Sequence, residues 1–391
     1  SNRSHFSSPD KMSSESKEMK AVELISPRKF HRIFTVPAAV KHGPLKVSYS
    51  IAGLDLGEGV DVPNILWCGA MFGTRWQAPW IDYAADKANV RIICIDRPGF
   101  GASTPVPLQD RLDTFLEIIP LLLAHLGIKY VALSSHSAGT IYAFNLLTQH
   151  PELLYPSNPS ITFFSPWVHQ SHSSVSLLKV ASMLPNALLG QWNKVMGFVL
   201  HNVQPVLSVS GGASQIVSQP FKNKLKTEKQ KEEDERKCMR GYGVSLEIKA
   251  ELDKAAFRYG FAENSEGLND EARLCLRSVK GISWGACEDY EECIKALKEA
   301  WGKRVEGGGK PLSVSVFLPE EDMMVEDKGM KYFEDVWREE NRGNGLKVEV
   351  VRWKGTDHDS APNPSNDAVW KMFELVKGVR TVGSDMEVEA S

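Results

Sequence analysis

Short apolar runs alternate with longer amphipathic segments from about residue 30 onward. Five of the runs are rich in β-branched or aromatic residues and almost free of polar interruptions, which is typical of strands covered on both faces. They lie at Val47–Ala52, Asn64–Cys68, Val90–Ile95, Tyr130–Ser134 and Ile161–Ser165. The clearest helix between them is Gln109–Leu126, whose apolar residues share one face. This order predicts an α/β fold with a mostly parallel central sheet flanked by helices.

The alternation stops after Trp167, and for about 120 residues the pattern is helical. It then resumes, with helices expected at 290–301, 328–340 and 368–376 and strands at 312–318 and 348–353. We therefore predict a core over residues 29–167 and 286–380, with a helical cap over 168–285 inserted after the sixth core strand. The ends are predicted to be a disordered leader over residues 1–28 and an acidic tail over residues 381–391.

Composition narrows the class of protein. The 46 basic and 49 acidic residues nearly cancel to −3, which argues against a nucleic-acid partner because a broad basic surface is missing. The first 25 residues are polar and lack the apolar centre of a secretory signal. No run of about 18 uninterrupted apolar residues is present, so we expect no stable membrane insertion and a cytoplasmic location. A homo-oligomer is compatible with the sequence.

No cofactor or metal is predicted. The six cysteines show no C-x-x-C spacing, and Cys68 and Cys94 lie inside predicted strands, so reduced structural thiols are expected. No group of histidine, cysteine and aspartate has zinc-site spacing. The stretch from Gly307 to Lys310 does not fit a phosphate-binding loop, because it precedes a strand and Pro311 stands where serine or threonine is required.

One serine is placed as a nucleophile would be. The five residues from Ser135 to Gly139 read S-H-S-A-G, and they follow a predicted strand and open a predicted helix. Small residues two before and two after Ser137 fit the tight strand-to-helix turn that lifts a nucleophilic hydroxyl clear of the backbone. The pattern alone is weak, since a serine that caps a helix is the alternative explanation.

With this motif in this position, the chain resembles the α/β-hydrolase superfamily, in the branch with a helical cap. Residues Asp96–Ser103 match the family's D-R-P-G-x-G-x-S stretch. Residues Trp67–Arg75 stand at the place of its H-G-x-x-G-S-R oxyanion loop, with Cys68 instead of histidine and one residue inserted. The resemblance implies an oxyanion hole formed by the backbone N–H groups of Ala138 and Ala70.

A serine hydroxyl needs a base, and the base needs an orienting acid. His358 lies between the last predicted strand and the last predicted helix, where the family has its catalytic histidine. Asp322 follows the predicted strand 312–318 in a stretch that resembles the family's G-x-x-D-x-x-V acid loop, with Pro319 in place of glycine. Glu321 remains open as the alternative acid. The order Ser, Asp, His is the order of this fold.

These residues predict a serine hydrolase that acts through an acyl-enzyme on Ser137. The expected partner is an apolar or aromatic small molecule with an ester, lactone, thioester or amide bond. Met71 and Trp167 adjoin the expected site and are candidate pocket residues. Two alternatives stay open: an acyltransferase or lyase in which another nucleophile outcompetes water, and a ligand-sensing receptor on the same fold.

Overall fold

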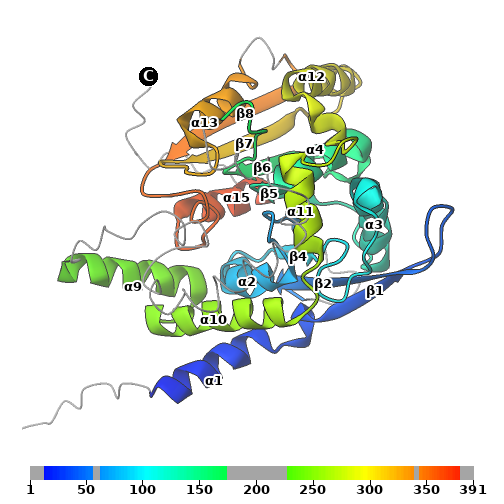
Figure 1. Ribbon diagram of the computed structural model, residues 1–391. Coiled ribbons are helices and arrows are strands. Elements are labelled where there is room, and N and C mark those ends of the chain that lie inside the picture. The colour runs from blue at the N-terminus through cyan, green and yellow to red at the C-terminus, as the bar shows by residue number, and fades with distance from the viewer. Residues whose placement is uncertain (1–12, 56–61, 174–226, 339–342, 379–391) are drawn as a thin grey trace, which may run out of the picture.

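The computed structural model describes residues 13–55, 62–173, 227–338 and 343–378. Within them, eight strands form one sheet in the order β1-β2-β4-β3-β5-β6-β7-β8 (Figure 1). Strand β2 is antiparallel to both β1 and β4, whereas every pair from β4 to β8 is parallel. The strands are β1 (Arg32–Val36), β2 (Leu45–Gly53), β3 (Asn64–Cys68), β4 (Arg91–Ile95), β5 (Ala132–His136), β6 (Ser160–Phe164), β7 (Leu312–Pro319) and β8 (Leu346–Trp353).

Helices cover both faces of this sheet. The described helices are α1 (Ser14–Ile25), α2 (Ala78–Lys87), α3 (Arg111–His125), α4 (Gly139–Gln149), α9 (Glu228–Tyr242), α10 (Leu246–Ala262), α11 (Gly267–Leu276), α12 (Tyr290–Glu306), α13 (Glu326–Asp335) and α15 (Asp367–Lys377). Helices α2 and α15 pack on one face, and α3, α4, α12 and α13 pack on the other. The α/β architecture predicted from the sequence is confirmed.

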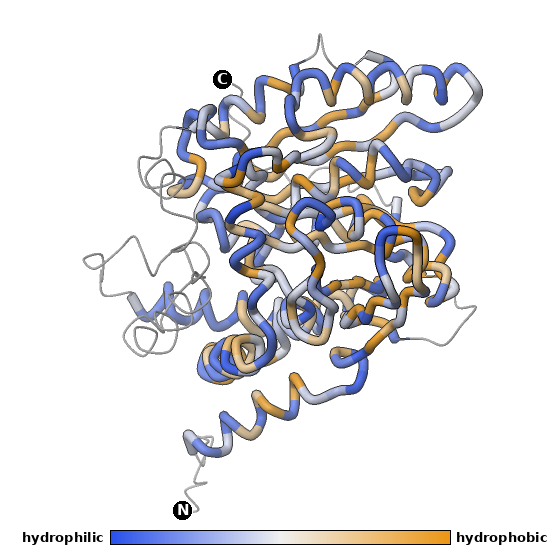
Figure 2. Tube along the Cα trace, turned by 45° about the vertical axis from the view of Figure 1, so that its right-hand side comes forward, coloured by the Kyte–Doolittle hydropathy of each residue, from blue (hydrophilic) through white to orange (hydrophobic). Residues whose placement is uncertain are grey.

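The two hydrophobic layers explain why the strands lack polar alternation. Along β3, Ile65 and Trp67 join the layer under α2 and α15, whereas Leu66 and Cys68 join the layer under α3 and α4. Side chains that alternate between two buried faces must all be apolar. Figure 2 accordingly shows hydrophobic residues along the central strands and mixed colours along the surrounding helices.

The predicted strands correspond to β2 through β8 with ends within about two residues. Strand β5 begins at Ala132, because the N–H of Val131 donates instead to the carbonyl of Leu153 (2.8 Å) outside the sheet. Strand β1 was not predicted. It is a short edge strand in which exposed and half-buried residues alternate, so it lacks the continuous apolar run of the inner strands.

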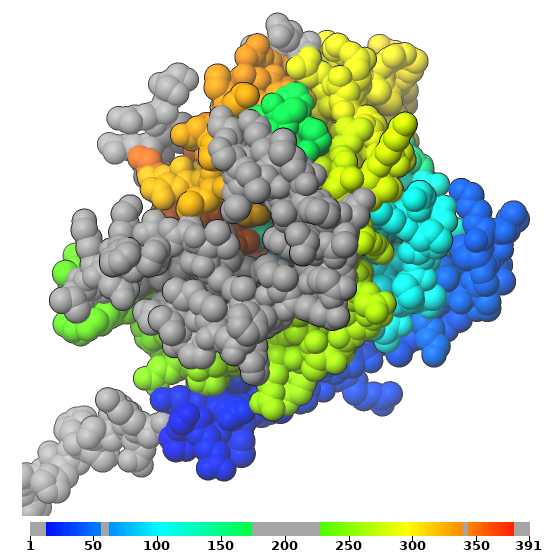
Figure 3. All heavy atoms as spheres, viewed as in Figure 1, coloured from blue at the N-terminus to red at the C-terminus, as the bar shows by residue number. Residues whose placement is uncertain are grey.

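Helix α1 corrects one prediction from the sequence. The disordered leader expected over residues 1–28 is wrong for α1, while residues 1–12 lie outside the described part of the chain. The hydroxyl of Ser13 caps the helix, and Ala21 and Ile25 are buried against α10. Figure 3 shows the dark blue surface of α1 beside the yellow-green surface of α10. The many charged residues of α1 concealed its narrow apolar face.

Between β6 and β7, the described residues form helices and no strand. We call α9, α10 and α11 the inserted helices; they occupy part of the predicted cap, whose residues 174–226 lie outside the described part. The predicted acidic tail also lies outside it. None of the described helices combines the length and the apolar character that crossing a bilayer requires.

Candidate active site

Ser137 occupies the turn between β5 and α4, and its backbone has a φ of +51°. Residues with a side chain seldom adopt this left-handed conformation, so surrounding contacts must impose it. The N–H of Ser137 donates to the carbonyl of Phe164 at the end of β6 (3.1 Å). Its carbonyl accepts from the N–H groups of Thr140 (2.9 Å) and Trp167 (3.2 Å). Main-chain bonds on both sides therefore hold the strained turn in place.

Gly139 shows why a small residue is needed two positions after Ser137. A Cβ atom at this position would lie 1.9 Å from the carbonyl oxygen of Cys68 and 2.7 Å from that of Gly69. The first turn of α4 and the end of β3 thus touch backbone to backbone. This approach places the loop that follows β3 directly beside the Ser137 turn.

His358 joins the two other residues predicted for catalysis. Its Nε2 atom lies 2.8 Å from Ser137 Oγ, and its Nδ1 atom lies 2.7 Å from Asp322 Oδ2. All three side chains are buried. When the serine hydroxyl donates to Nε2, Nδ1 carries the ring proton and donates it to the carboxylate. Two hydrogen bonds fix the loop that carries His358. The N–H of Asp357 donates to the hydroxyl of Ser360, and the N–H of Ser360 donates to the carboxylate of Asp357 (both 2.8 Å).

Both oxygens of Asp322 are engaged. Oδ2 contacts His358, and Oδ1 accepts from the N–H groups of Met324 (2.8 Å) and Val325 (3.0 Å). Glu321, the alternative acid, is exposed, and only its backbone N–H reaches the histidine loop, by donating to the carbonyl of Thr356 (3.2 Å). The structure therefore brings Asp322, and not Glu321, to the imidazole.

The surroundings of His358 raise its pKa above the ordinary 6.5. Burial alone would lower the pKa, because it disfavours the charged imidazolium. The charge and hydrogen bond of Asp322 outweigh burial, with smaller contributions from Asp359 and Asp357. A raised pKa makes the imidazole a stronger proton acceptor, which is the property that a general base needs.

The loop after β3 is a tight turn in which the N–H of Gly73 donates to the carbonyl of Ala70 (2.7 Å). In the described part of the chain, the N–H groups of Ala70, Met71 and Ala138 donate to no protein group. The two N–H groups predicted for the oxyanion hole thus make no hydrogen bond to the residues that the structure describes. A bound anionic oxygen would find them available.

The two candidate pocket residues differ in placement. Trp167 has no exposed surface, and its indole N–H donates to the carbonyl of Cys275 on α11 (3.3 Å). Because its backbone N–H also bonds Ser137, Trp167 supports the turn from behind. Met71 is half-buried at the margin of the core. Their assignment to a substrate pocket stays a prediction.

Comparisons with known proteins agree with this architecture. Residues 63–206 match the family described as alpha/beta hydrolase fold, whereas no curated protein sequence matches the chain significantly. The solved structure of carboxylesterase CesB (YbfK) from Bacillus subtilis is 14% identical with a TM-score of 0.50, over 93% of this chain and 97% of CesB. The chain has the α/β-hydrolase fold. A mutant of esterase E22 shares this fold, with 13% identity and a TM-score of 0.51 over 88% of this chain and 98% of the esterase. A membrane phospholipase A described as a bacterial virulence factor also shares it, with 13% identity and a TM-score of 0.51 over 94% of this chain and 92% of the phospholipase.

Within this α/β-hydrolase fold, His136 has a role that the sequence did not reveal. Its Nε2 donates to the backbone carbonyl of His358 (2.9 Å). Burial, together with the nearby His358, lowers the pKa of His136 to about 4, so the ring is neutral at neutral pH. The contact joins residues that are 222 positions apart, and no local pattern announces it.

The same two histidines and Asp359 form a cluster whose potential metal-ligand atoms lie within 4.8 Å of one another. Both ring nitrogens of His358 are already bonded, to Ser137 and Asp322. The Nε2 atom of His136 is also used as a donor. A cation that bound His358 here would have to break the chain of hydrogen bonds, so these residues do not fit a metal site in this α/β-hydrolase fold.

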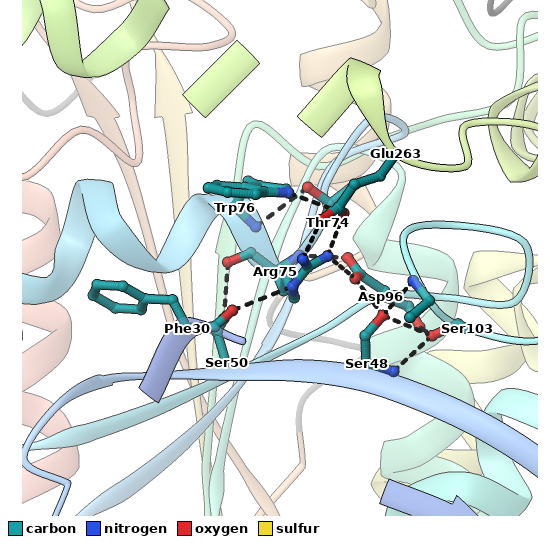
Figure 4. Close-up of polar contacts among 10 residues, drawn as sticks. Phe30, Ser48, Ser50, Thr74, Arg75, Trp76, Asp96, Ser103 and Glu263 are labelled. Atoms are coloured by element: carbon teal, nitrogen blue, oxygen red, sulfur yellow. Dashed lines mark hydrogen bonds and ion pairs between the residues drawn. The ribbon is translucent and has the colours of Figure 1, made fainter. Parts of the chain in front are cut away.

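Arg75 anchors the far end of the loop after β3 (Figure 4). Its guanidinium is buried and donates to the carboxylate of Asp96 (2.7 Å) and to the carbonyl of Phe30 (3.2 Å). It also donates to the carboxylate of Glu263 (2.6 Å), the residue that follows α10. Asp96 also accepts from the backbone N–H of Arg75 (2.7 Å) and from the hydroxyl of Ser48 (2.6 Å). The aspartate of the D-R-P-G-x-G-x-S stretch therefore fixes the arginine that ends the predicted oxyanion loop.

Proposed function

We propose that this protein is a serine hydrolase that cleaves an ester-type bond through an acyl-enzyme on Ser137. The observation that carries the proposal is the unbroken chain of hydrogen bonds from Ser137 through His358 to Asp322, at a serine whose backbone is held in the left-handed conformation. A serine hydroxyl is a poor nucleophile until an oriented base accepts its proton, and this arrangement supplies such a base.

The proposed reaction has two steps. Ser137 Oγ attacks the substrate carbonyl carbon while His358 Nε2 takes the hydroxyl proton, and the electron pair of the carbonyl moves onto its oxygen. The N–H groups of Ala138 and Ala70 donate to that oxyanion. Collapse expels the leaving group, which receives the proton from His358. Water then attacks the acyl carbon while His358 takes its proton, the bond between the acyl group and Ser137 Oγ breaks, and Ser137 regains the proton from His358 as the acid leaves. Asp322 orients the ring and stabilises the imidazolium in both steps.

The proposed substrate is a small molecule with an apolar or aromatic acyl group. The supporting observation is that two loops next to the site each carry a half-buried apolar side chain: Met71 in the loop after β3 and Met324 in the loop that carries Asp322. Methionine is flexible and polarizable, so it adapts to irregular apolar ligands. Neither residue would compensate the charge of an anionic acyl group.

Labelling with a fluorophosphonate tests the nucleophile. We expect the wild type to be labelled at Ser137 and the Ser137→Ala variant to remain unlabelled. Ser313→Ala is the matched control, because Ser313 lies at the opposite end of the parallel strands, at the start of β7. Labelling should be unchanged in this control. Equal labelling of Ser137→Ala and the wild type would refute the assignment.

A panel of esters with increasing acyl length tests the reaction and the substrate class. Hydrolysis with many turnovers, fastest for apolar or aromatic acyl groups, is expected. Product that forms only when an alcohol or amine is added would favour acyl transfer instead. Labelling without turnover on any ester, thioester or amide would favour a receptor that binds its ligand without consuming it.

A further inference from the structure

A side chain from the turn after β4 holds the loop that we propose stabilises the oxyanion. Arg97 follows β4, and its guanidinium donates to the backbone carbonyls of Gly69 (2.9 Å), Ala70 and Met71 (3.2 Å). The residue is only 2% exposed. Because the guanidinium is planar and its N–H groups have a fixed arrangement, one side chain orients three successive carbonyls.

Because the peptide bond is planar, fixing the direction of a carbonyl also fixes the direction of the N–H group in the same peptide. The carbonyl of Gly69 and the N–H of Ala70 belong to one planar trans peptide and point in opposite directions, and so do the carbonyl of Ala70 and the N–H of Met71. Arg97 therefore turns the N–H groups of Ala70 and Met71 away from itself. Its positive charge at the carbonyl end also polarises each peptide and strengthens the N–H as a donor.

Arg97 is held in turn by the inserted helices. Its Nε atom lies 3.1 Å from Oε1 of Glu271, on α11. The same carboxylate oxygen accepts from Arg111 Nε (2.7 Å) and from the hydroxyl of Tyr142 (2.6 Å), and the Arg97 guanidinium lies 4.7 Å from the centre of the Tyr142 ring. All four side chains are buried. A buried guanidinium without a nearby carboxylate is unfavourable, so Glu271 determines whether Arg97 stays in place.

Backbone contacts make this connection rigid. The N–H of Gly267, the first residue of α11, donates to the carbonyl of Gly99 (2.9 Å), and the N–H of Gly101 donates to the carbonyl of Asn264 (2.9 Å). A Cβ atom at Gly99 would lie 3.0 Å from the Gly267 Cα atom. The turn that carries Arg97 is thus clamped directly against the start of α11, with no side chain between them.

We propose that Arg97 is a positioning residue that aims the N–H groups of the loop after β3 at the oxyanion, and that Glu271 holds Arg97 in position. The proposal rests on the hydrolase function proposed above. It gives one of the inserted helices a part in the rate of the chemical step, which is distinct from any contact with the substrate.

The test compares Arg97→Lys with Arg91→Lys. Arg91 is a matched control because it is also buried and donates to a backbone carbonyl, that of Leu54 (3.1 Å), but lies at the opposite end of β4. Lysine keeps the charge but cannot orient three carbonyls. Removing one oxyanion donor costs about 10²–10³-fold in kcat, so a misdirected donor should cost Arg97→Lys about 10- to 100-fold. KM should stay within about threefold, and Arg91→Lys should stay within about threefold in both constants.

Inhibition by a trifluoromethyl ketone distinguishes a positioning role of Arg97 from a merely structural one. Its tetrahedral adduct with the serine resembles the transition state, so its inhibition constant reports the oxyanion donors. We expect this constant to rise in Arg97→Lys by the same factor by which kcat/KM falls. Glu271→Gln, which keeps a hydrogen-bond acceptor but removes the charge, should lose about 3- to 10-fold in kcat with proportionate weakening of inhibition.

The outcomes separate this proposal from the function on which it rests. An active wild type together with an Arg97→Lys variant of unchanged kcat and inhibition would overturn the role of Arg97 and leave the hydrolase intact. Equal losses in Arg97→Lys and Arg91→Lys would overturn it as well, because the effect would then be structural. If Arg97→Lys does not fold, Glu271→Gln decides in its place. A wild type that neither accepts the fluorophosphonate nor turns over an ester would overturn both proposals.

Discussion

The Ser137 turn and the loop after β3 supply the two halves of the proposed oxyanion hole, yet they are held in different ways. Main-chain bonds to Phe164 and Thr140 fix the Ser137 turn, so its support comes from the sheet and from its own helix. Two buried arginines hold the loop, Arg75 and Arg97, and each is paired with a glutamate from or next to the inserted helices. Changes in the inserted helices should therefore disturb the loop more than the turn, to which α11 is joined through the indole N–H of Trp167.

The largest expected effect comes from Asp322→Asn, which tests the base that both regions serve. Losing the carboxylate removes the group that orients the ring of His358, so kcat should fall about 10³–10⁴-fold. Without the charge that raises the pKa of His358, the acidic limb of the kcat/KM profile should also move to lower pH. Rates of ester hydrolysis across pH 5–9 check both effects. Glu321→Gln is the control, and a loss confined to that variant would identify Glu321 as the acid.

Gly139→Ala breaks the contact between the two regions. The added methyl group would lie 1.9 Å from the carbonyl of Cys68, so either the turn or the loop must move. We expect kcat to fall about 100-fold or more, and the free energy of unfolding to fall by about 1–3 kcal/mol. Gly302→Ala is the control, because Gly302 lies in α12 with open space around it. That variant should be as stable as the wild type or slightly more so, and equal losses in both variants would contradict the contact.

The histidines on either side of the turn predict opposite dependences of stability on pH. The pKa of His136 is about 4 in the folded protein and about 6.5 when unfolded, so stability is lost as the pH falls from 6.5 to 4, by up to about 3 kcal/mol. His358, with a raised pKa, contributes stability that is present below pH 6.5 and lost as the pH rises through its folded pKa. Denaturant unfolding at pH 7, 5.5 and 4.5 should show a smaller acid loss in His136→Gln. If the free energy of unfolding depends on pH equally in the variant and the wild type, the pKa of His136 is not lowered by folding.

The smallest effect is expected from Glu263→Gln, which loosens the Arg75 end of the loop. Glu263 is about one-third exposed, and Arg75 keeps its bonds to Asp96, so the free energy of unfolding should fall by no more than about 1 kcal/mol. The kcat should stay within about threefold of the wild type. Glu271→Gln should cost more activity, because Arg97 is the side chain that contacts the loop carbonyls. A larger kinetic loss in Glu263→Gln would reverse the assignment.

The sheet and the residues joined at Ser137 could be predicted because their signals are local. Small residues around Ser137 mark a strand-to-helix turn, and the loops that carry Asp322 and His358 each follow a predicted strand in the order of the fold. The departure at Cys68 is also understandable, since burial raises the pKa of its thiol to about 12 and the residue packs in the core. A charge-neutral thiol of this kind needs no partner at the end of β3.

The supports of the site could not be predicted. Arg97 reaches carbonyls up to 28 residues away, and its acid lies on a helix separated from it by several core elements. In the sequence it was simply the second residue of a turn motif. The hydrogen bond from His136 to the carbonyl of His358 likewise depends on how the end of β5 packs against a distant loop. Such contacts are set by the completed fold, and no periodicity or short motif encodes them.

The contact between Gly99 and Gly267 decides where this chain can be recombined with others. A chimera that takes foreign helices up to Glu263 keeps the native stretch from Asn264 onward, including the glycine seated on the turn and the acid shared by two arginines. A chimera that also replaces α11 would place the Cβ atom of any other residue at position 267 only 2.7 Å from the carbonyl oxygen of Pro98. Losing Glu271 would also leave the buried side chains of Arg97 and Arg111 without their shared carboxylate. In a chimera designed to change substrate choice, the junction between foreign and native sequence should therefore lie immediately before Asn264.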